Sequence, residues 1–148
     1  CIVTDHAPHT LEAKSAGFPN APAGMPGVET SLPLMLTHAK EGRCSVSDVV
    51  KWMCAGPAKV YGIQNKGSLI EGFDGDLTLV DLENHRTIQD SDTWTRVGWT
   101  PYAGMELTGW PMYTIVDGNI VHKRELGGNL RGSPVALPGS TGRVLKFK

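Results

Sequence analysis

The chain has 148 residues, of which 40% are hydrophobic and 20% are charged, a composition typical of one ordinary globular domain. It carries 14 Lys and Arg against 15 Asp and Glu, which gives a formal net charge of −1. This balance argues against a surface that binds nucleic acid or an anionic membrane. We expect neither a membrane span nor a secretory signal, and therefore a cytoplasmic protein.

Three cysteines, Cys1, Cys44 and Cys54, form neither a CxxC pair nor a zinc-ribbon pattern. We expect reduced thiols, because secreted disulfide scaffolds carry more cysteines, usually in even number. Cys54 falls in a helical apolar pattern, which favours a small core residue over a nucleophile. The apolar start of the chain is typical of a buried strand and indicates a piece of a longer polypeptide.

Residues 1–4 are predicted to form that strand, and residues 11–28 to form a loop rich in Gly and Pro. Loops of this length inside compact domains are uncommon and often functional. Two helices follow, because apolar residues recur at helical spacing. The first stripe is Leu32, Met35, Leu36 and Ala39, and the second is Val46, Val49, Val50, Met53 and Cys54.

Helix ends can also be placed. Thr30 or Ser31 can cap the first helix, and Ser45 or Ser47 the second. Gly56-Pro57 is expected to break the second helix, with a further helical turn at about residues 57–61.

Beyond residue 65 the pattern favours β structure. Leu77 and Leu79 alternate with polar residues, and residues 112–116 and 119–122 are predicted to form a hairpin across Asp117-Gly118. From Gly127 onward we expect a surface strap or a disordered end.

The order of elements predicts an α/β protein. Residues 1–64 are interpreted as the last βα part of a larger architecture, and residues 65–132 as a small β-sandwich part. Residues 133–148 are interpreted as a C-terminal tail. Neither of the first two parts is expected to be self-sufficient, because a parallel strand needs neighbours in its sheet.

The strongest chemical signal is Thr4-Asp5-His6-Ala7-Pro8-His9, which places one carboxylate and two imidazoles at the end of the apolar strand. Active sites lie at the C-terminal ends of barrel strands. A carboxylate there can bind a divalent cation or move a proton. Asp-His beside Pro is also ordinary loop chemistry. The cluster does not complete a metal site, and His38, His85 and His122 are isolated.

These residues carry a resemblance. Thr4-Asp5-His6-Ala7-Pro8-His9-Thr10, with Glu12 and Lys14 after it, resembles the strand-8 signature of dihydroorotases of the amidohydrolase superfamily. Residues 25–30 are similar to that family's following loop and helix start. Residues 67–77 resemble the entry to the superfamily's small β-sandwich, and residues 99–102 and 109–111 fit the same stretch. The resemblance spans residues 1–132, and its later motifs are shared with hydantoinase-like relatives.

The resemblance implies the C-terminal portion of a metal-dependent βα (TIM-type) barrel followed by a β-sandwich. It implies an enzyme that interconverts N-carbamoyl-L-aspartate and (S)-dihydroorotate in pyrimidine biosynthesis. Asp5 would be a metal ligand and the general acid/base. His9 would bind the substrate's carboxylate, and Ala23 and Gly24 would offer backbone groups, although many relatives have Phe where Ala23 stands.

The resemblance also implies cofactors and partners. One or two Zn²⁺ ions would bind, with the other ligands, including a His-x-His pair, upstream of Cys1. The partners would be the small-molecule substrate, the remainder of the barrel and further copies in a homo-oligomer, with a transcarbamoylase as an optional partner. Because Asp5 is a single ligand, we expect the isolated chain to bind zinc weakly and to be inactive.

Three alternatives stay open. The parent could be an allantoinase or a dihydropyrimidinase, although His-Ala-Pro-His and Gly-Val-Glu-Thr favour dihydroorotase. It could be a dihydroorotase-like scaffold without activity, against which Asp5 and His9 argue. The β unit could be a separate binding module with an aromatic ligand face, although we expect these residues to be core and interface aromatics of the sandwich instead, because large aromatic residues usually bury. That face would comprise Trp94, Trp99, Trp110 and Tyr113.

Overall fold

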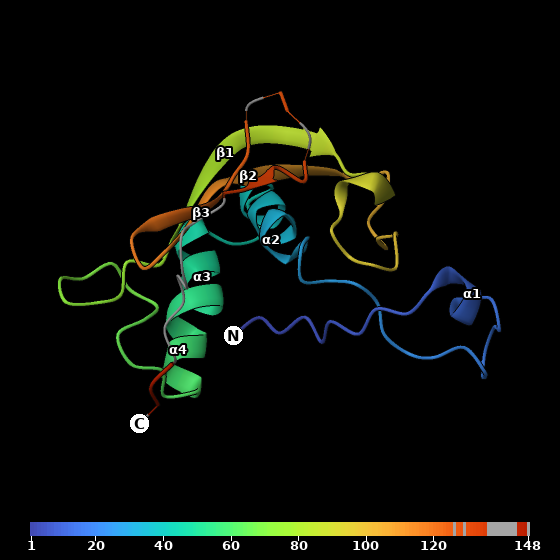
Figure 1. Cartoon of the computed structure of the whole chain (residues 1–148), viewed down its shortest axis with the longest axis horizontal. Coiled ribbons are helices and arrows are strands. Elements are labelled where there is room, and N and C mark those ends of the chain that lie inside the picture. The colour runs from blue at the N-terminus through green and yellow to red at the C-terminus, as the bar shows by residue number, and fades with distance from the viewer. Residues whose placement is uncertain (126, 129, 136–144, 148) are drawn as a thin grey trace.

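The computed structural model describes residues 1–125, 127–128, 130–135 and 145–147. Helical segments come first in the chain and a sheet follows (Figure 1). The helical segments are α1 (Leu11–Lys14), α2 (Ser31–Lys40), α3 (Val46–Val50), a π-helical turn (Lys51–Ala55) and α4 (Gly56–Val60). The later elements are β1 (Leu77–Thr87), a 3₁₀ turn (Asp90–Asp92), β2 (Glu106–Val116), β3 (Asn119–Lys123) and β4 (Ser133–Pro134).

The strands form one antiparallel sheet in the order β1-β2-β3-β4. Leu77 lies opposite Ile115, and Tyr113 lies opposite Lys123. Within the described ranges this is a single sheet, so the predicted β-sandwich is not confirmed. A sandwich needs a second sheet facing the first.

The predicted hairpin is confirmed. Asp117 and Gly118 connect β2 to β3 with φ values of 49° and 77°. Two successive residues with positive φ make the tight turn that matches the twist of antiparallel strands. The turn is tied to the start of β1, because the Asp76 carboxylate accepts a hydrogen bond from the Asp117 N–H at 2.8 Å.

Asp76 also forms an ion pair with Lys66, which lies 3.0 Å from the Asp74 carboxylate. These two carboxylates raise the pKa of the Lys66 ammonium. Asp74 and Asp76 therefore stabilise the backbone where the chain enters β1.

The core of the sheet is built on Leu107 and Trp110 of β2, with Ile88 beside them. Leu130 packs into the same cluster and is only 4% exposed. The prediction that the chain from Gly127 is a surface strap or a disordered end is therefore wrong at Leu130, because an apolar side chain gains free energy when a nearby cluster buries it. Part of that prediction concerns residues 136–144, which lie outside the described residues.

Of the four aromatic residues predicted to lie in the core or at an interface, Trp110 is buried at 3% exposure, whereas Trp94 is 55% exposed. Tyr113 is also exposed, because it lies on the outer face of β2. The prediction that these aromatic residues belong to the core or to an interface is thus confirmed for the core at Trp110. For Trp94 and Tyr113 it stays a prediction.

Helix α2 packs directly on β2, as Figure 1 shows. The backbone of Gly109 has φ of 83°, and a Cβ built there would stand 2.6 Å from the Leu36 Cβ. Only glycine permits this close approach without displacement. The Thr37 hydroxyl accepts a hydrogen bond from the Thr108 N–H at 2.8 Å, which fixes the register of helix on strand.

The second predicted helix is longer than expected. Ser45 caps α3, and its side chain and backbone pair reciprocally with Asp48 in a capping box. The predicted break at Gly56-Pro57 is wrong, because α3, the π-helical turn and α4 run on without interruption. The Gly56 N–H bonds to the Lys51 carbonyl, and this wider turn accommodates a proline that cannot donate.

Cys54 lies on this helix and is exposed, so its predicted place in the core is wrong. All three cysteines are free thiols, as predicted. Along this helical run the buried residues are Val49, which belongs to the predicted stripe, and Ala58.

Residues 1–10 form neither helix nor strand, and they pair with no strand among the described residues. The prediction of a strand at residues 1–4 is therefore wrong for the chain as described. An extended backbone becomes a strand only when neighbouring strands accept and donate its hydrogen bonds. Here the Ile2 N–H donates to the Trp52 carbonyl at 3.0 Å, so the segment lies against the long helix instead.

Candidate functional site

The candidate site is the end of the N-terminal segment together with the loop that returns to it. The Ala7 N–H donates to the Met25 carbonyl at 3.2 Å. Gly24 has φ of 102°, and a Cβ built there would stand 2.6 Å from the Ala7 carbonyl oxygen. Gly24 is therefore required for the loop to lie against the segment, and it brings Ala23 and Gly24 close to residues 5–9.

His6 fastens the same loop. Its Nδ1 atom accepts hydrogen bonds from the N–H groups of Gly27 and Val28, at 3.1 and 3.2 Å. An accepting Nδ1 carries no proton, so these partners assign the neutral tautomer protonated at Nε2. The ring thus holds the loop in place.

Asp5 is exposed, and its backbone lies in the left-handed region with φ of 45°. Asp tolerates this conformation better than most residues do, but it is still uncommon. No hydrogen bond or ion pair joins its carboxylate to another residue of the described part of the chain. The carboxylate is therefore available to a ligand.

The metal donors are few. Among the described residues, no group of three or more His, Cys, Asp or Glu side chains is placed to hold a metal ion. The carboxylate of Asp5 has the chemistry of a zinc ligand, but a structural or catalytic zinc site takes three or four protein ligands. Asp5 can therefore supply one ligand of a site whose remaining ligands come from elsewhere.

His9 is half-buried, and its backbone is held from a distant part of the chain. The indole Nε1–H of Trp99 donates to the His9 carbonyl at 2.8 Å. Sequence reasoning missed this contact, because 90 residues separate its two partners and nothing local signals it.

The loop that carries Trp99 is itself anchored to the start of α2. The Glu29 carboxylate accepts the Trp94 and Thr95 N–H groups at 2.7 and 2.9 Å. Glu29 belongs to the stretch 25–30 that the sequence singled out, so that stretch joins the returning loop to the loop after the 3₁₀ turn. Figure 1 shows this second loop descending from the end of β1 on the side of the N-terminal segment.

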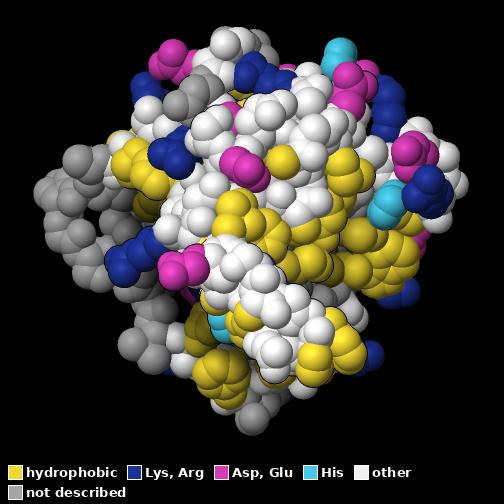
Figure 2. All heavy atoms as spheres, turned by 90° about the vertical axis from the view of Figure 1, so that its right-hand side faces the viewer, with side chains coloured by type: hydrophobic (Ala, Val, Ile, Leu, Met, Phe, Trp, Pro, Cys, Tyr) yellow, Lys and Arg dark blue, Asp and Glu magenta, His cyan; other side chains and the backbone are white. Residues whose placement is uncertain are grey.

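The structure thus brings Ala23 and Gly24 to the segment that carries Asp5 and His9. Ala23 is exposed, as is Asp5. Figure 2 shows the face on this side of the molecule, where hydrophobic side chains reach the surface. Leu11, Phe18 and Val28 are among the exposed large hydrophobic residues of the chain.

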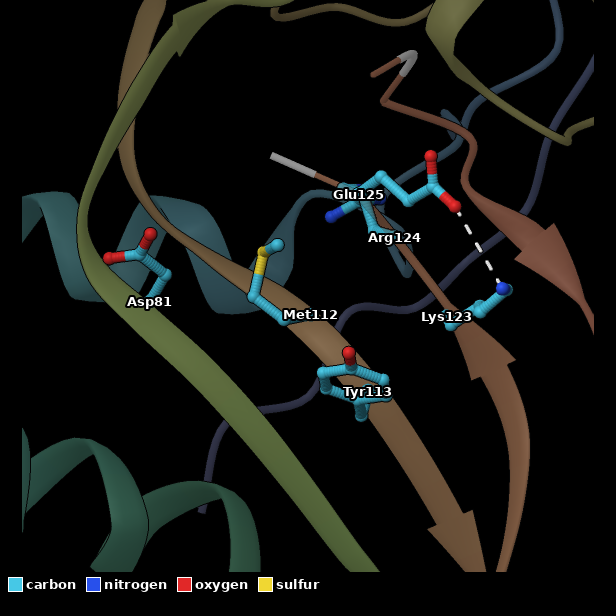
Figure 3. A pocket seen from close by; sticks show the side chains of 6 residues that line it. All are labelled: Asp81, Met112, Tyr113, Lys123, Arg124 and Glu125. Carbon is cyan, nitrogen blue, oxygen red and sulfur yellow. Dashed lines mark ion pairs between the residues drawn. The ribbon is translucent and has the colours of Figure 1, made fainter. Parts of the chain in front are cut away.

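The larger hollows lie elsewhere. One, of about 430 Å³, lies over β1 and β2, and Figure 3 shows the Lys123–Glu125 ion pair at its edge. It is lined by Asp81, Met112, Tyr113, Lys123, Arg124 and Glu125. A more apolar one, of about 580 Å³, lies between the long helix and the stretch 66–79. Neither hollow is lined by any of the predicted site residues.

Arg124, which lines the first hollow, is engaged in contacts that hold the sheet together. Its guanidinium lies 5.3 Å from the centre of the Trp110 ring and donates to the carbonyls of Pro111 and Leu130. Burial, together with the nearby Arg86, lowers the pKa of Arg124. The arginine thereby pins the chain after β3 onto the core.

Comparison with known proteins places this geometry in a class. The family model described as "Amidohydrolase family" matches residues 1–121 of this chain. The chain is 41% identical over 145 residues to the dihydroorotase of Pyrococcus furiosus, and 38% identical over 143 residues to that of Methanothermobacter thermautotrophicus. These alignments cover 97% and 95% of this chain but 34% and 33% of the relatives. The chain therefore belongs to the amidohydrolase family and spans about a third of the length of these curated relatives.

Solved structures agree on the fold. The L-hydantoinase (dihydropyrimidinase) of Arthrobacter aurescens is 34% identical, with a TM-score of 0.81, covering 95% of this chain and 31% of that one. A D-hydantoinase structure is 27% identical, with a TM-score of 0.71, covering 84% of this chain and 27% of that one.

In the described residues, every helix is too short or too polar to cross a membrane.

Proposed function

We propose that the protein containing this chain is a zinc-dependent dihydroorotase, which interconverts N-carbamoyl-L-aspartate and (S)-dihydroorotate. The observation that carries the proposal is the Asp5 carboxylate. It is exposed, is not engaged by the rest of the described chain, and stands beside a loop that Gly24 and His6 hold in place. This arrangement occurs in a chain about 40% identical to proteins named dihydroorotase.

Asp5 would hold a zinc ion through one carboxylate oxygen. When bound, zinc would polarise the amide carbonyl as a Lewis acid and would lower the pKa of a water, so that its deprotonated form could attack the carbonyl at neutral pH. Asp5 takes a proton from the attacking water and returns it to the leaving ring nitrogen as general acid. Exposure suits this role, because a carboxylate without an internal partner stays free to accept the proton.

His9 would bind the substrate's carboxylate through a ring N–H. Ala23 and Gly24 would offer backbone groups to the same ligand. The contact of Gly24 with Ala7 supports this, because it holds the loop backbone near the end of the segment without a side chain in between. A backbone contact does not depend on the side chain, so Ala23 in place of the phenylalanine of many relatives is compatible with it.

In the complete protein, residues 1–64 would be the last part of a TIM-type barrel, residues 65–132 part of a β-sandwich, and residues 133–148 a tail. The barrel would supply the other ligands for one or two zinc ions. The protein would act in cytoplasmic pyrimidine biosynthesis as a homo-oligomer, with a transcarbamoylase as an optional partner.

The test is a substrate panel on the complete protein, with kcat/KM measured for dihydroorotate, carbamoyl aspartate, allantoin, dihydrouracil and hydantoin. The proposal expects dihydroorotate and carbamoyl aspartate to be preferred. A preference for dihydrouracil or hydantoin would favour a dihydropyrimidinase, which the likeness to the Arthrobacter enzyme supports as the second candidate. Preference for allantoin would identify an allantoinase, and inactivity on all five with zinc present would favour a scaffold.

The isolated chain offers a separate test. With one carboxylate ligand it should show no tight, stoichiometric zinc binding by calorimetric titration, and no turnover. A dissociation constant in the micromolar range or below, at one zinc per chain, would contradict the proposed division of ligands between this chain and the rest of the protein.

A further inference from the structure

The hydrogen bond from Trp99 to His9 joins the sheet half of the chain to the candidate site. The indole Nε1–H lies 2.8 Å from the His9 carbonyl oxygen, and the contact is partly buried. It is the backbone of His9 that is held, which leaves the imidazole free for a ligand.

The chain is also held by hydrogen bonds before and after His9. Before it, the Ala7 N–H bonds to the Met25 carbonyl. After it, Thr10 caps α1, and its hydroxyl accepts the Ala13 N–H at 3.2 Å. Between these two contacts lies the peptide group that joins His9 to Thr10, and Trp99 holds the carbonyl of that group. The bond thus restrains the peptide group that follows His9, and with it the backbone position from which the imidazole projects.

Trp99 can act in this way because its own loop is held. Glu29 accepts the N–H groups of Trp94 and Thr95, and the Asp90 carboxylate accepts the Thr100 N–H at 2.8 Å. Thr100 is buried, with 5% exposure. A donor on a fixed loop costs less conformational entropy when it binds than a donor on a mobile loop.

We propose that Trp99 is a positioning residue for substrate recognition: its indole N–H orients His9 toward the substrate's carboxylate. This inference rests on the proposed function insofar as it names the carboxylate as the group that His9 binds. In this role Trp99 acts through the backbone carbonyl of His9.

The test compares Trp99→Phe with Trp94→Phe in the complete protein. Trp94 is a matched control, because it lies on the same loop and its indole N–H donates at 3.0 Å to another backbone carbonyl, that of Arg131. Trp99→Phe should raise KM for dihydroorotate roughly three- to tenfold, the effect of one lost hydrogen bond, with kcat within twofold. Trp94→Phe should leave KM unchanged.

A second readout separates positioning from general stability. Dihydrouracil lacks the carboxylate, so kcat/KM for dihydroorotate relative to dihydrouracil should fall by the same factor in Trp99→Phe only. An equal loss on both substrates, an equal loss in both variants, or an unchanged KM in Trp99→Phe would overturn the inference.

A third readout does not depend on activity. In protein labelled with ¹³C-histidine, the His9 carbonyl and ring signals, assigned by their loss in His9→Asn, should shift in Trp99→Phe and stay in place in Trp94→Phe. If the unaltered protein does not process dihydroorotate, the proposed function is wrong, while these signals still decide whether Trp99 orients His9. Unmoved His9 signals in Trp99→Phe would refute the positioning role.

Discussion

The sheet and the N-terminal segment are held in opposite ways. In the sheet, β2 pairs with β1 and β3 along an antiparallel ladder with a few register shifts, and Leu107 and Trp110 are buried in its core. Residues 1–10 have no such ladder among the described residues, and a few hydrogen bonds from distant groups hold them. The candidate site residues Asp5 and His9 therefore lie where contacts between distant parts of the chain determine the backbone. The regular part supplies the anchor.

Asp5→Asn should give the largest effect and would show that the irregular segment carries the chemistry. Asn keeps the shape of Asp and tolerates the left-handed backbone, but it cannot take a proton. We expect kcat of the complete protein to fall at least about 100-fold, with the unfolding midpoint unchanged. Asp117→Asn is the matched control, since Asp117 also has positive φ, 49° against 45°. Retained activity in Asp5→Asn would contradict the proposed role.

Gly109→Ala tests the regular half. The new Cβ would be forced against Leu36 and would push α2 away from β2. We expect a loss of about 2–4 kcal/mol in the free energy of unfolding, measured with urea, from overpacking and backbone strain together. Gly98→Ala has a similar φ, 71°, but open space around the Cβ, so it should cost only the strain, about 1 kcal/mol. Equal losses in the two variants would show that the close packing of helix on strand contributes nothing.

His6→Ala tests whether single side chains hold the segment. Gly27 and Val28 would lose the acceptor for their N–H groups, at a cost of about 1–2 kcal/mol to the local structure. Amide exchange at these two residues should therefore speed up roughly 5- to 30-fold, and exchange in β2 should not change. His6→Asn, whose Oδ1 can replace Nδ1 as an acceptor, should restore much of the protection. Unchanged exchange in His6→Ala would refute the holding role.

The smallest effect concerns pH and the α3 cap. Hydrogen bonds from Ser45 lower the pKa of the Asp48 carboxyl from its ordinary value of 3.8. An acid whose pKa is lowered by folding stabilises the protein above its unfolded pKa, and that stability is lost as pH falls below about 3.8. The gap in urea midpoint between the unaltered protein and Asp48→Asn should therefore shrink between pH 5 and pH 3. A gap independent of pH would contradict the linkage.

Features that depend on near neighbours in sequence were predictable. Asp117-Gly118 makes the predicted turn, and Ser45 caps the predicted helix. The apolar stripe from Leu32 to Ala39 forms α2 (Ser31–Lys40), although Thr30 makes no side-chain cap and its hydroxyl bonds to the Gly27 carbonyl instead. The resemblance to dihydroorotases also groups Asp5 and His9 with Ala23 and Gly24, and the structure brings the two segments together.

Other features depended on partners that no local pattern reveals. The helix continued through Gly56-Pro57 because a π-helical turn absorbed the missing donor. Leu130 entered the core because a cluster from β2 was near enough to bury it. His6 acquired its role from N–H groups 21 and 22 residues away, and Trp99 reached His9 across 90 residues.

The turn at Asp117-Gly118, the cap at Ser45, the helical stripe of α2 and the chemical character of the site follow from the sequence, because each depends on dihedral preferences or side-chain types within a few residues. Only the tertiary structure decided how that site is held. Closing loops of 21 and 90 residues costs entropy, and only the packed sheet and helices can offset that cost and bring His6 to Gly27 and Trp99 to His9.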